Sequence, residues 1–298
     1  MTDIINATHL GLRYHRRWAL HDCTFALEPG RITALVGPNG SGKTTLLHLA
    51  MGLLPPTVGE LHVCGSIPHQ QPKDLLPCVG FVAQNHPLYR SFTVAEMLIM
   101  GRLLNPHWDD EFARTRLAQL AIPVKQHCGH LSGGQAAQLA LVLALAKRPD
   151  LLLLDEPVAS LDPLARADLL SVLLETVAER GTSVVLSSHI IAELERVCDS
   201  VLLLANGRVN LQGSLEEVLA DHVRVTGPTT EVTSLAHLHA LITVRHEGRQ
   251  TTAIVRRNGP IFGSQWQIAS LSLEEIVLAY LSQARDITNI LPYLEVRA

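Results

Sequence analysis

Residues 37–45 read GPNGSGKTT and match the pattern G-x-x-x-x-G-K-[ST]. The short apolar run ITALV at Ile32–Val36 comes directly before this stretch, and residues 44–51 follow it with the pattern of a helix. In such a strand–turn–helix, the glycines let successive backbone N–H groups turn inward around phosphate oxygens, and the helix adds its positive end. The stretch therefore predicts a phosphate-binding loop in an α/β protein.

Several side chains of this loop have expected roles. Lys43 should reach the β- and γ-phosphates, the Thr44 hydroxyl should ligate Mg²⁺, and the Thr45 hydroxyl is a further donor to the α-phosphate. The candidate nucleotide-binding residues of the loop are Gly37, Pro38, Asn39, Gly40, Ser41, Gly42, Lys43, Thr44 and Thr45. Alone, the loop indicates only a nucleotide, because kinases, GTPases and motor ATPases all carry it.

An acidic pair follows a run of leucines at residues 151–157 (LLLLDEP). The leucines predict a buried strand that delivers Asp155 and Glu156 at its carboxyl end, where ligands bind in open α/β sheets. Asp155 should hold Mg²⁺, directly or through water, and Glu156 should polarise the attacking water as general base. A solvated acidic pair at a strand end is the alternative interpretation.

The sequence LSGGQ at residues 131–135 stands ahead of a leucine-rich segment that predicts a buried helix. Ser132, Gly133 and Gly134 offer a hydroxyl and unhindered N–H groups at the expected helix N-terminus, which is a second phosphate-binding device. A plain helix N-cap is the alternative.

Seven motifs occur in order between about residues 4 and 220. They are Tyr14, the loop at 37–45, Gln84 in FVAQ, LSGGQ, LLLLDEP, the SLD at residues 160–162, and His189 after VVLSS. In this order they resemble the nucleotide-binding subunit of ATP-binding cassette (ABC) transporters. The resemblance implies a P-loop α/β cassette with a mostly parallel sheet, antiparallel N-terminal strands and a helical subdomain.

The resemblance also implies roles for single residues. Tyr14 stacks on adenine, Asp162 belongs to a loop that crosses to the opposite subunit, and His189 contacts the γ-phosphate. Gln84 senses Mg²⁺ and the lytic water. The implied catalytic set is Glu156, His189 and Gln84, and the implied Mg²⁺ ligands are Thr44, Gln84 and Asp155.

Assembly follows from the same resemblance. In this family LSGGQ caps the ATP of a second, head-to-tail subunit, so Ser132, Gly133, Gly134 and Gln135 are implied to bind a partner's nucleotide. One cassette per chain implies a homo- or heterodimer around two ATP, which drives a separate permease from the cytoplasmic face of the membrane. Tyr89 and residues 90–97 are implied to line the groove for a permease helix.

The rest of the chain predicts the domain organisation. Strand patterns at 151–154, 183–186 and 200–204 alternate with helical patterns at 165–180 and 190–197, and residues 85–145 read as a helical subdomain with helices at 94–104 and 109–120. Strands at 223–225, 242–246 and 252–256 and a short amphipathic helix at 273–281 complete the pattern. We predict a cassette over residues 1–220 and a small α+β accessory domain over 221–298.

Two segments suggest a subgroup. The tail SLSLEEIVLAYL at 270–281 and the sequence NPHWD at 105–109 are similar to cassettes that pair with separate permeases of the ABC-2 exporter type. A regulatory or dimer-stabilising appendage is the alternative for the tail.

Other functions fit less well. Family members that act on ribosomes carry two cassettes in one chain, and those that act in DNA repair carry long coiled coils, whereas this chain shows one cassette and no heptads. The formal net charge of -4 gives no case for nucleic acid. A nucleotide switch without turnover is a third hypothesis, against which Glu156 and His189 argue.

Composition adds two expectations. The richest apolar run, at 139–146, is shorter than the roughly 18 residues of a membrane-spanning helix. The five cysteines form no CxxC pair, which predicts free thiols in a reducing cytoplasm.

Overall fold

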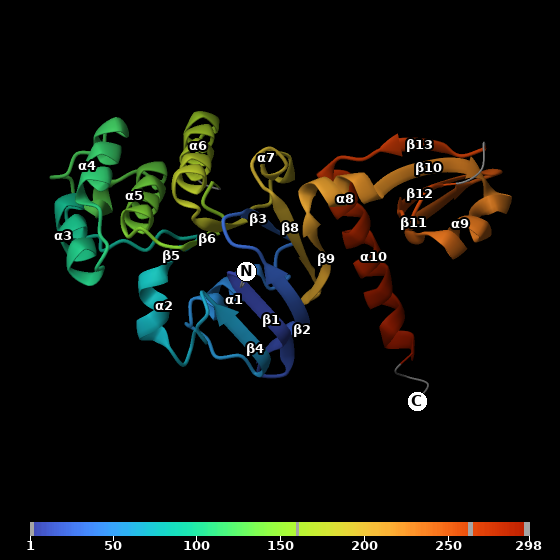
Figure 1. The fold of residues 1–298 in the computed structure, drawn as a ribbon, viewed down its shortest axis with the longest axis horizontal. Coiled ribbons are helices and arrows are strands. Elements are labelled where there is room, and N and C mark those ends of the chain that lie inside the picture. The colour runs from blue at the N-terminus through green and yellow to red at the C-terminus, as the bar shows by residue number, and fades with distance from the viewer. Residues whose placement is uncertain (1–2, 159–160, 262–264, 295–298) are drawn as a thin grey trace.

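A six-stranded sheet with the order β5-β6-β7-β3-β8-β9 forms the centre of the chain in the computed structural model, which describes residues 3–158, 161–261 and 265–294 (Figure 1). Its strands are β3 Ile32–Val36, β5 Val79–Val82, β6 Leu151–Asp155, β7 Ser183–Ser187, β8 Ser200–Ala205 and β9 Arg208–Ser214. Neighbouring strands run parallel except β8 and β9, which are antiparallel. The prediction of a mostly parallel sheet is confirmed.

The leucine run of β6 explains how the sheet is buried. Leu152 and Leu154 join the core on one face, whereas Leu151 and Leu153 join the core on the other. Side chains alternate between faces along a strand, so a strand covered on both faces needs an apolar residue at every position. Helix α6 (Pro163–Arg180) contributes to the first core and helix α1 (Lys43–Ala50) to the second.

An antiparallel sheet of order β2-β1-β4 packs beside α1, as the sequence predicted for the N-terminal strands. Its strands are β1 Ile5–Tyr14, β2 Arg17–Leu27 and β4 Val58–Val63. A tight turn joins β1 to β2 and brings Tyr14 directly opposite Arg17. Figure 1 shows this sheet below the central sheet, next to α1.

Three helices at one end of the molecule form the helical region (Figure 1). They are α3 Val94–Leu104, α4 Asp110–Gln119 and α5 Gly133–Ala146, packed around a core of their own, with α2 Pro72–Cys78 before β5 and a 3-10 turn at Cys128–His130. Thr93 and Glu96 form a capping box that begins α3 where the sequence predicted it. Helix α5 begins at Gly133, inside the LSGGQ motif, because Ser132 caps it.

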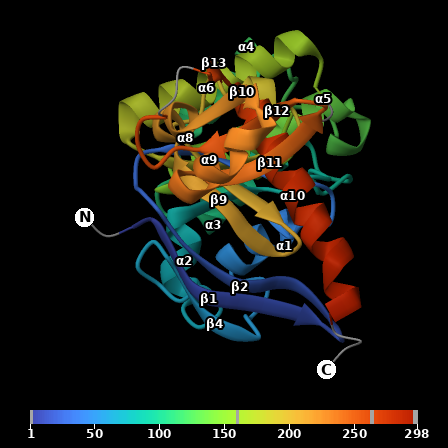
Figure 2. The ribbon, with the colours of Figure 1, turned by 90° about the vertical axis from the view of Figure 1, so that its right-hand side faces the viewer.

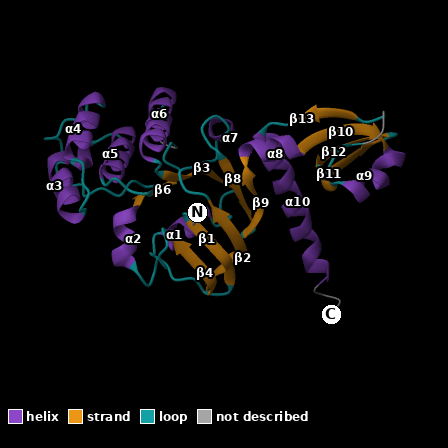
Figure 3. Cartoon of the chain, viewed as in Figure 1, coloured by secondary structure: helices purple, strands orange, loops and turns teal. Residues whose placement is uncertain are grey.

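The C-terminal part is a four-stranded antiparallel sheet of order β11-β12-β10-β13 with the short helices α8 and α9 and the long helix α10 (Figures 2 and 3). Its elements are α8 Leu215–Asp221, β10 His222–Pro228, a 3-10 turn at Thr229–Glu231, α9 Val232–Leu238, β11 Ala240–Glu247, β12 Gln250–Arg256, β13 Gln267–Ser270 and α10 Leu273–Leu294. Helix α10 is much longer than the predicted 273–281. Helix α7, at Ile191–Leu194, is shorter than the predicted 190–197.

Helix α10 ties this region to the cassette. Ile276 and Val277 are fully buried and belong to the same core as Leu203 of β8. The core is therefore continuous across residue 220, and the domain boundary at 220/221 stays a prediction. Across the described ranges, no helix has the length and apolar character of a membrane span.

Candidate nucleotide-binding site

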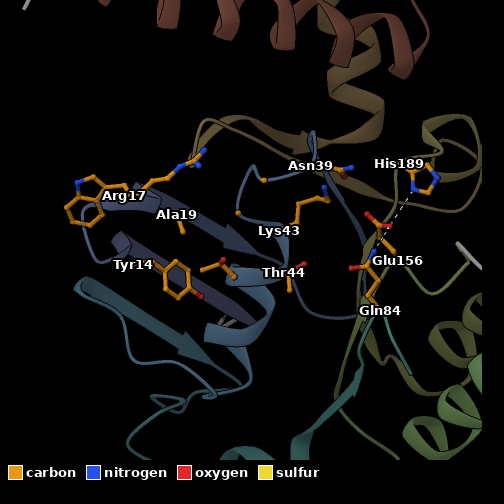
Figure 4. A pocket seen from close by; sticks show the side chains of 13 residues that line it. Tyr14, Arg17, Ala19, Asn39, Lys43, Thr44, Gln84, Glu156 and His189 are labelled. Atoms are coloured by element: carbon orange, nitrogen blue, oxygen red, sulfur yellow. Dashed lines mark hydrogen bonds and ion pairs between the residues drawn. The ribbon is translucent and has the colours of Figure 1, made fainter. Parts of the chain in front are cut away.

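A cavity of about 700 Å³ opens over the phosphate loop (Figure 4). Its lining comes from the β1–β2 hairpin, the loop, the start of α1, and the segments that follow β5, β6 and β7. The lining residues are Tyr14, Arg17, Trp18, Ala19, Asn39, Gly40, Gly42, Lys43, Thr44, Thr45, Gln84, Glu156 and His189. The volume is in the range of small-molecule sites, and the position beyond the carboxyl ends of parallel strands is where such sites form.

Two loop glycines are required by close backbone contacts. Gly42 has a φ of 108°, and a Cβ there would lie 2.7 Å from the Ala19 carbonyl oxygen. Gly37 has a φ of 155°, and a Cβ there would lie 2.2 Å from the Leu204 carbonyl oxygen. Any larger residue would push the loop away from the strands that support it.

The Lys43 side chain folds back onto the phosphate loop. Its ammonium donates hydrogen bonds to the carbonyl oxygens of Gly37 (2.8 Å) and Pro38 (3.2 Å), and the residue is 6% exposed. Burial lowers the pKa of this ammonium, and the carboxylates of Glu156 and Asp155 partly oppose the shift. An anionic ligand would stabilise the charge that burial disfavours.

Ser41 supplies a test of whether phosphate fits this loop. Its hydroxyl is buried and has no hydrogen-bond partner among the described residues. A buried hydroxyl without a partner is costly, and a phosphate oxygen is a natural acceptor for it.

Asp155 is held from both sides at the end of β6. Its Oδ2 accepts a 2.7 Å hydrogen bond from the Thr44 hydroxyl, and its Oδ1 accepts a 2.8 Å hydrogen bond from the Ser187 hydroxyl. The carboxylate and the Thr44 hydroxyl are hard oxygen donors, which is the ligand chemistry that Mg²⁺ prefers.

Glu156 lies between two other predicted residues. Gln84 Nε2 donates to Glu156 Oε2 at 3.2 Å, and His189 Nδ1 lies 3.6 Å from the same oxygen (Figure 4). Glu156 has a φ of 49°, a left-handed conformation that a non-glycine residue adopts at a cost of about 1 kcal/mol or more. The structure therefore brings together all three residues that the sequence analysis proposed for catalysis.

Sequence reasoning missed Ser187. Its hydroxyl accepts a 2.8 Å hydrogen bond from the Glu156 backbone N–H while it donates to Asp155. The parallel register pairs Ser187 with Asp155 across β6 and β7. The signal was present in VVLSS, because a polar residue that ends a buried strand lies at the same edge as the acidic pair.

The hairpin end was only partly predicted. Tyr14 is 47% exposed and lines the cavity, as expected of a residue that stacks on a base. Arg17, Trp18 and Ala19 line the cavity as well, and the sequence analysis did not name them. Their nearness to Tyr14 within a tight hairpin was the available signal.

The LSGGQ motif, called the signature from here on, and Asp162 lie outside the cavity lining. Ser132 and Gln135 form a capping box that begins α5, and neither they nor Gly133 and Gly134 line the cavity. Asp162 caps α6 by accepting hydrogen bonds from two backbone N–H groups of its first turn, and it does not line the cavity. Ser160, the first residue of the SLD motif, falls outside the described residues. Four other predicted residues do not line the cavity: Gly37, Pro38, Ser41 and Asp155. Ser41 and Asp155 are buried, whereas Pro38 is exposed.

A phosphate loop, an acidic pair at the end of one strand and a histidine just beyond the neighbouring strand form the arrangement of a P-loop ATPase of the cassette class. Comparison with known proteins identifies the family within this class. The family model described as "ABC transporter" matches residues 20–159, and a model described as "AAA domain, putative AbiEii toxin, Type IV TA system" matches residues 129–195.

Curated relatives have the same character. "ABC transporter ATP-binding protein YtrB" of Bacillus subtilis is 32% identical over 69% of this chain and 70% of that protein. "Nod factor export ATP-binding protein I" of Burkholderia lata is 32% identical over 72% of this chain and 74% of that protein. "L-cystine transport system ATP-binding protein TcyN" of Escherichia coli is 32% identical over 73% of this chain and 92% of that protein.

A solved "ATP binding subunit of ABC transporter" superposes with a TM-score of 0.67 at 29% identity, covering 73% of this chain and 92% of that one. The chain therefore belongs to the family of ABC transporter ATP-binding proteins and is an ABC-type ATPase. The predicted fold class, a P-loop ABC cassette, is confirmed.

Proposed function

We propose that this chain hydrolyses ATP as a head-to-tail dimer and thereby drives a separate membrane permease. The observation that supports a dimer is the position of Ser132 and Gly134, which lie outside the cavity of their own chain. A nucleotide in this cavity meets the phosphate loop on one side only. A second chain turned head to tail would supply the missing wall from its own α5 N-terminus.

Within the part of the site that one chain supplies, the described residues have separate roles. Lys43 and Ser41 bind phosphate oxygens, and Tyr14 stacks on adenine. Glu156 accepts the proton of the attacking water, and its position is held by Gln84 and His189. Thr44, Asp155 and Gln84 are the residues that would hold Mg²⁺, which supplies positive charge against the phosphates.

Mixing two defective variants tests whether the site is shared. Lys43→Ala removes the phosphate-loop cation, and Ser132→Arg blocks the signature. Each variant alone should lack ATPase activity. Their mixture should regain part of it, because the mixed dimer contains one site with an intact loop and an intact signature.

The controls for this experiment use the same proteins. Mixing two separately prepared batches of Lys43→Ala should give no recovery. If the Lys43→Ala and Ser132→Arg mixture also stays inactive while both variants remain folded, the site is not shared between copies of this chain.

A surface for the permease lies on the helical region. Tyr89 is 59% exposed ahead of α3, and Leu103 and Leu104 at the end of α3 are exposed as well. The two leucines lie at the opposite end of α3 from Tyr89. Tyrosine is enriched in protein–protein contacts, so the exposed Tyr89 supports a contact surface at the start of α3. We assign the surface around Tyr89 and residues 90–97 to a permease helix, and we propose that the chain works at the cytoplasmic face of the membrane.

Isolation of the tagged chain from membranes tests this partner. A multi-span membrane protein should co-isolate with the wild type, and Tyr89→Ala should reduce its yield without lowering the ATPase activity of the purified chain. Co-isolation with ribosomes instead would support the alternative function as a soluble ABC ATPase that acts on ribosomes or nucleic acid.

We also infer an exporter of the ABC-2 type. Support comes from the segments NPHWD and SLSLEEIVLAYL and from relatives named for Nod factor export. In vesicles that carry the chain and its permease with the ATPase outside, an exporter should move cargo inward on addition of ATP. ATP-driven loss of preloaded cargo would indicate import.

A further inference from the structure

The β1–β2 hairpin contributes residues from two adjacent cross-strand pairs to the cavity lining, with Trp18 in the second pair. Tyr14 and Arg17 are directly opposed in the strand register, and both line the cavity. Arg13 and Trp18 form the adjacent pair, and the Arg13 guanidinium lies 5.5 Å from the centroid of the Trp18 ring. Directly opposed residues share a face of the ribbon, and successive pairs alternate between faces.

The indole of Trp18 fixes this arrangement. Gly11 leaves room for it, because a Cβ on Gly11 would lie 3.0 Å from an indole carbon. The His21 ring packs edge-on against the indole at 4.9 Å between centroids. Because successive residues of a strand point to opposite faces, Arg17 extends from the face opposite to the Trp18 indole, and both side chains border the cavity. Figure 4 shows the Arg17 side chain reaching from β2 toward the phosphate-loop side of the cavity.

Arg17 also has its charge available. It has no ion-pair partner within the part of the chain that the structure describes. The other lining cation, Lys43, lies on carbonyl oxygens of its own loop. A nucleoside triphosphate carries three to four negative charges, and a guanidinium binds phosphate oxygens through paired N–H donors.

We propose that Arg17 is a second phosphate-binding cation of this site, holding the polyphosphate of the nucleotide from the hairpin side while Lys43 holds it from the loop. The inference rests on nucleotide binding in this cavity. The Arg17 side chain is exposed at the edge of the cavity, so we expect it to strengthen nucleotide binding chiefly through its charge. It therefore acts on the phosphates and not on the base.

The neighbouring arginine provides a matched control. Arg16 lies in the same turn and is exposed, but it does not line the cavity. Arg17→Ala and Arg16→Ala remove the same charge from adjacent positions. Calorimetry with ATP and with AMP, each at low and high salt, separates a local contact from a general effect of net charge.

Arg17→Ala should weaken ATP binding about three- to tenfold at low salt, weaken AMP binding less, and reduce the salt dependence of ATP affinity. Arg16→Ala should match the wild type, and Arg17→Lys should recover part of the loss. Arg17→Gln replaces the alanine variant if that variant fails to fold.

Three outcomes would overturn the proposal: unchanged affinity in Arg17→Ala, equal losses in Arg16→Ala and Arg17→Ala, or equal losses for ATP and AMP. Failure of nucleotide binding itself looks different. In that case the wild type binds no ATP, or Lys43→Ala binds it as well as the wild type does.

Discussion

The hydroxyl of Thr44 donates a 2.7 Å hydrogen bond to Oδ2 of Asp155, which joins the first turn of α1 to the end of β6. The other oxygen of that carboxylate accepts from Ser187, whose hydroxyl also accepts from the Glu156 backbone N–H. Three hydrogen bonds therefore link the phosphate loop, the proposed metal-binding carboxylate and the proposed general base. Displacement of one of these groups will therefore shift the positions of the other two.

Ser187→Ala should disturb this chain of contacts. The change removes one hydrogen bond to Asp155 and leaves the Glu156 N–H without its acceptor, which costs about 1–3 kcal/mol of folding stability. We expect kcat for ATP hydrolysis to fall clearly while KM changes little, because Ser187 positions Glu156 and does not line the cavity. Steady-state kinetics and urea unfolding measure the two effects.

Ser188→Ala is the matched control. Ser188 is equally buried, but its hydroxyl accepts from the Ile190 backbone N–H and bonds to neither carboxylate. A kcat loss as large in Ser188→Ala as in Ser187→Ala would mean that general destabilisation of β7 explains both.

Glu156→Gln should separate binding from hydrolysis. The amide keeps the shape and can still accept from Gln84, but it cannot take a proton from water. We expect hydrolysis to fall by about 10²- to 10⁴-fold, with ATP affinity retained and an ATP-bound dimer accumulating. Phosphate release and size-exclusion chromatography with ATP measure these effects. Glu175→Gln, an exposed change on α6, should behave as wild type. Normal turnover by Glu156→Gln would remove the general-base role.

Lys43→Ala should abolish detectable ATP binding. The wild type should also show a protonation signature, because burial lowers the pKa of the Lys43 ammonium. Phosphate stabilises the charged form and raises that pKa again, so binding should take up protons at alkaline pH. Calorimetry in buffers of different ionisation enthalpy measures the uptake. Equal uptake in a Lys43→Arg variant that still binds ATP would assign the proton to another group.

Local sequence patterns predicted the elements that depend on local contacts. The strand Ile32–Val36 and the helix Val94–Leu104 have the predicted bounds. The first is an unbroken apolar run that ends at a glycine, and the second begins at its own capping box. The phosphate loop belongs to the same class, because its function requires a fixed spacing of glycine, lysine and threonine.

The elements that were missed depend on distant segments. Ser187 becomes important only through the register of β7 on β6, and Arg17 only because the hairpin folds over a loop some twenty residues later. Helix α10 was predicted to end at 281, and the polar residues Ser282 and Gln283 follow that position. The helix continues, and Ala284 in its next turn is buried.

The contact between His222 and Tyr280 should make folding stability depend on pH. His222 is fully buried; its Nδ1 lies 2.7 Å from the Val218 carbonyl oxygen and its Nε2 lies 2.9 Å from the Tyr280 hydroxyl. The neutral imidazole satisfies both contacts by donating from Nδ1 and accepting at Nε2. Burial lowers the pKa of this imidazole, and the nearby charge of Arg256 adds to the shift. The hydrogen bond to the Val218 carbonyl and the charge of Asp221 oppose it.

The sign of the effect follows from this shift. Below about pH 6.5 the unfolded chain binds a proton at His222 that the folded chain resists, so stability is lost as the pH falls through this range toward the folded pKa. Urea unfolding between pH 5 and 8 should show a steeper loss in the wild type than in His222→Gln. The exposed His237→Gln on α9 should keep the wild-type slope. Parallel pH profiles for the wild type and His222→Gln would show that His222 titrates alike in both states, and the buried pair would then contribute no pH dependence.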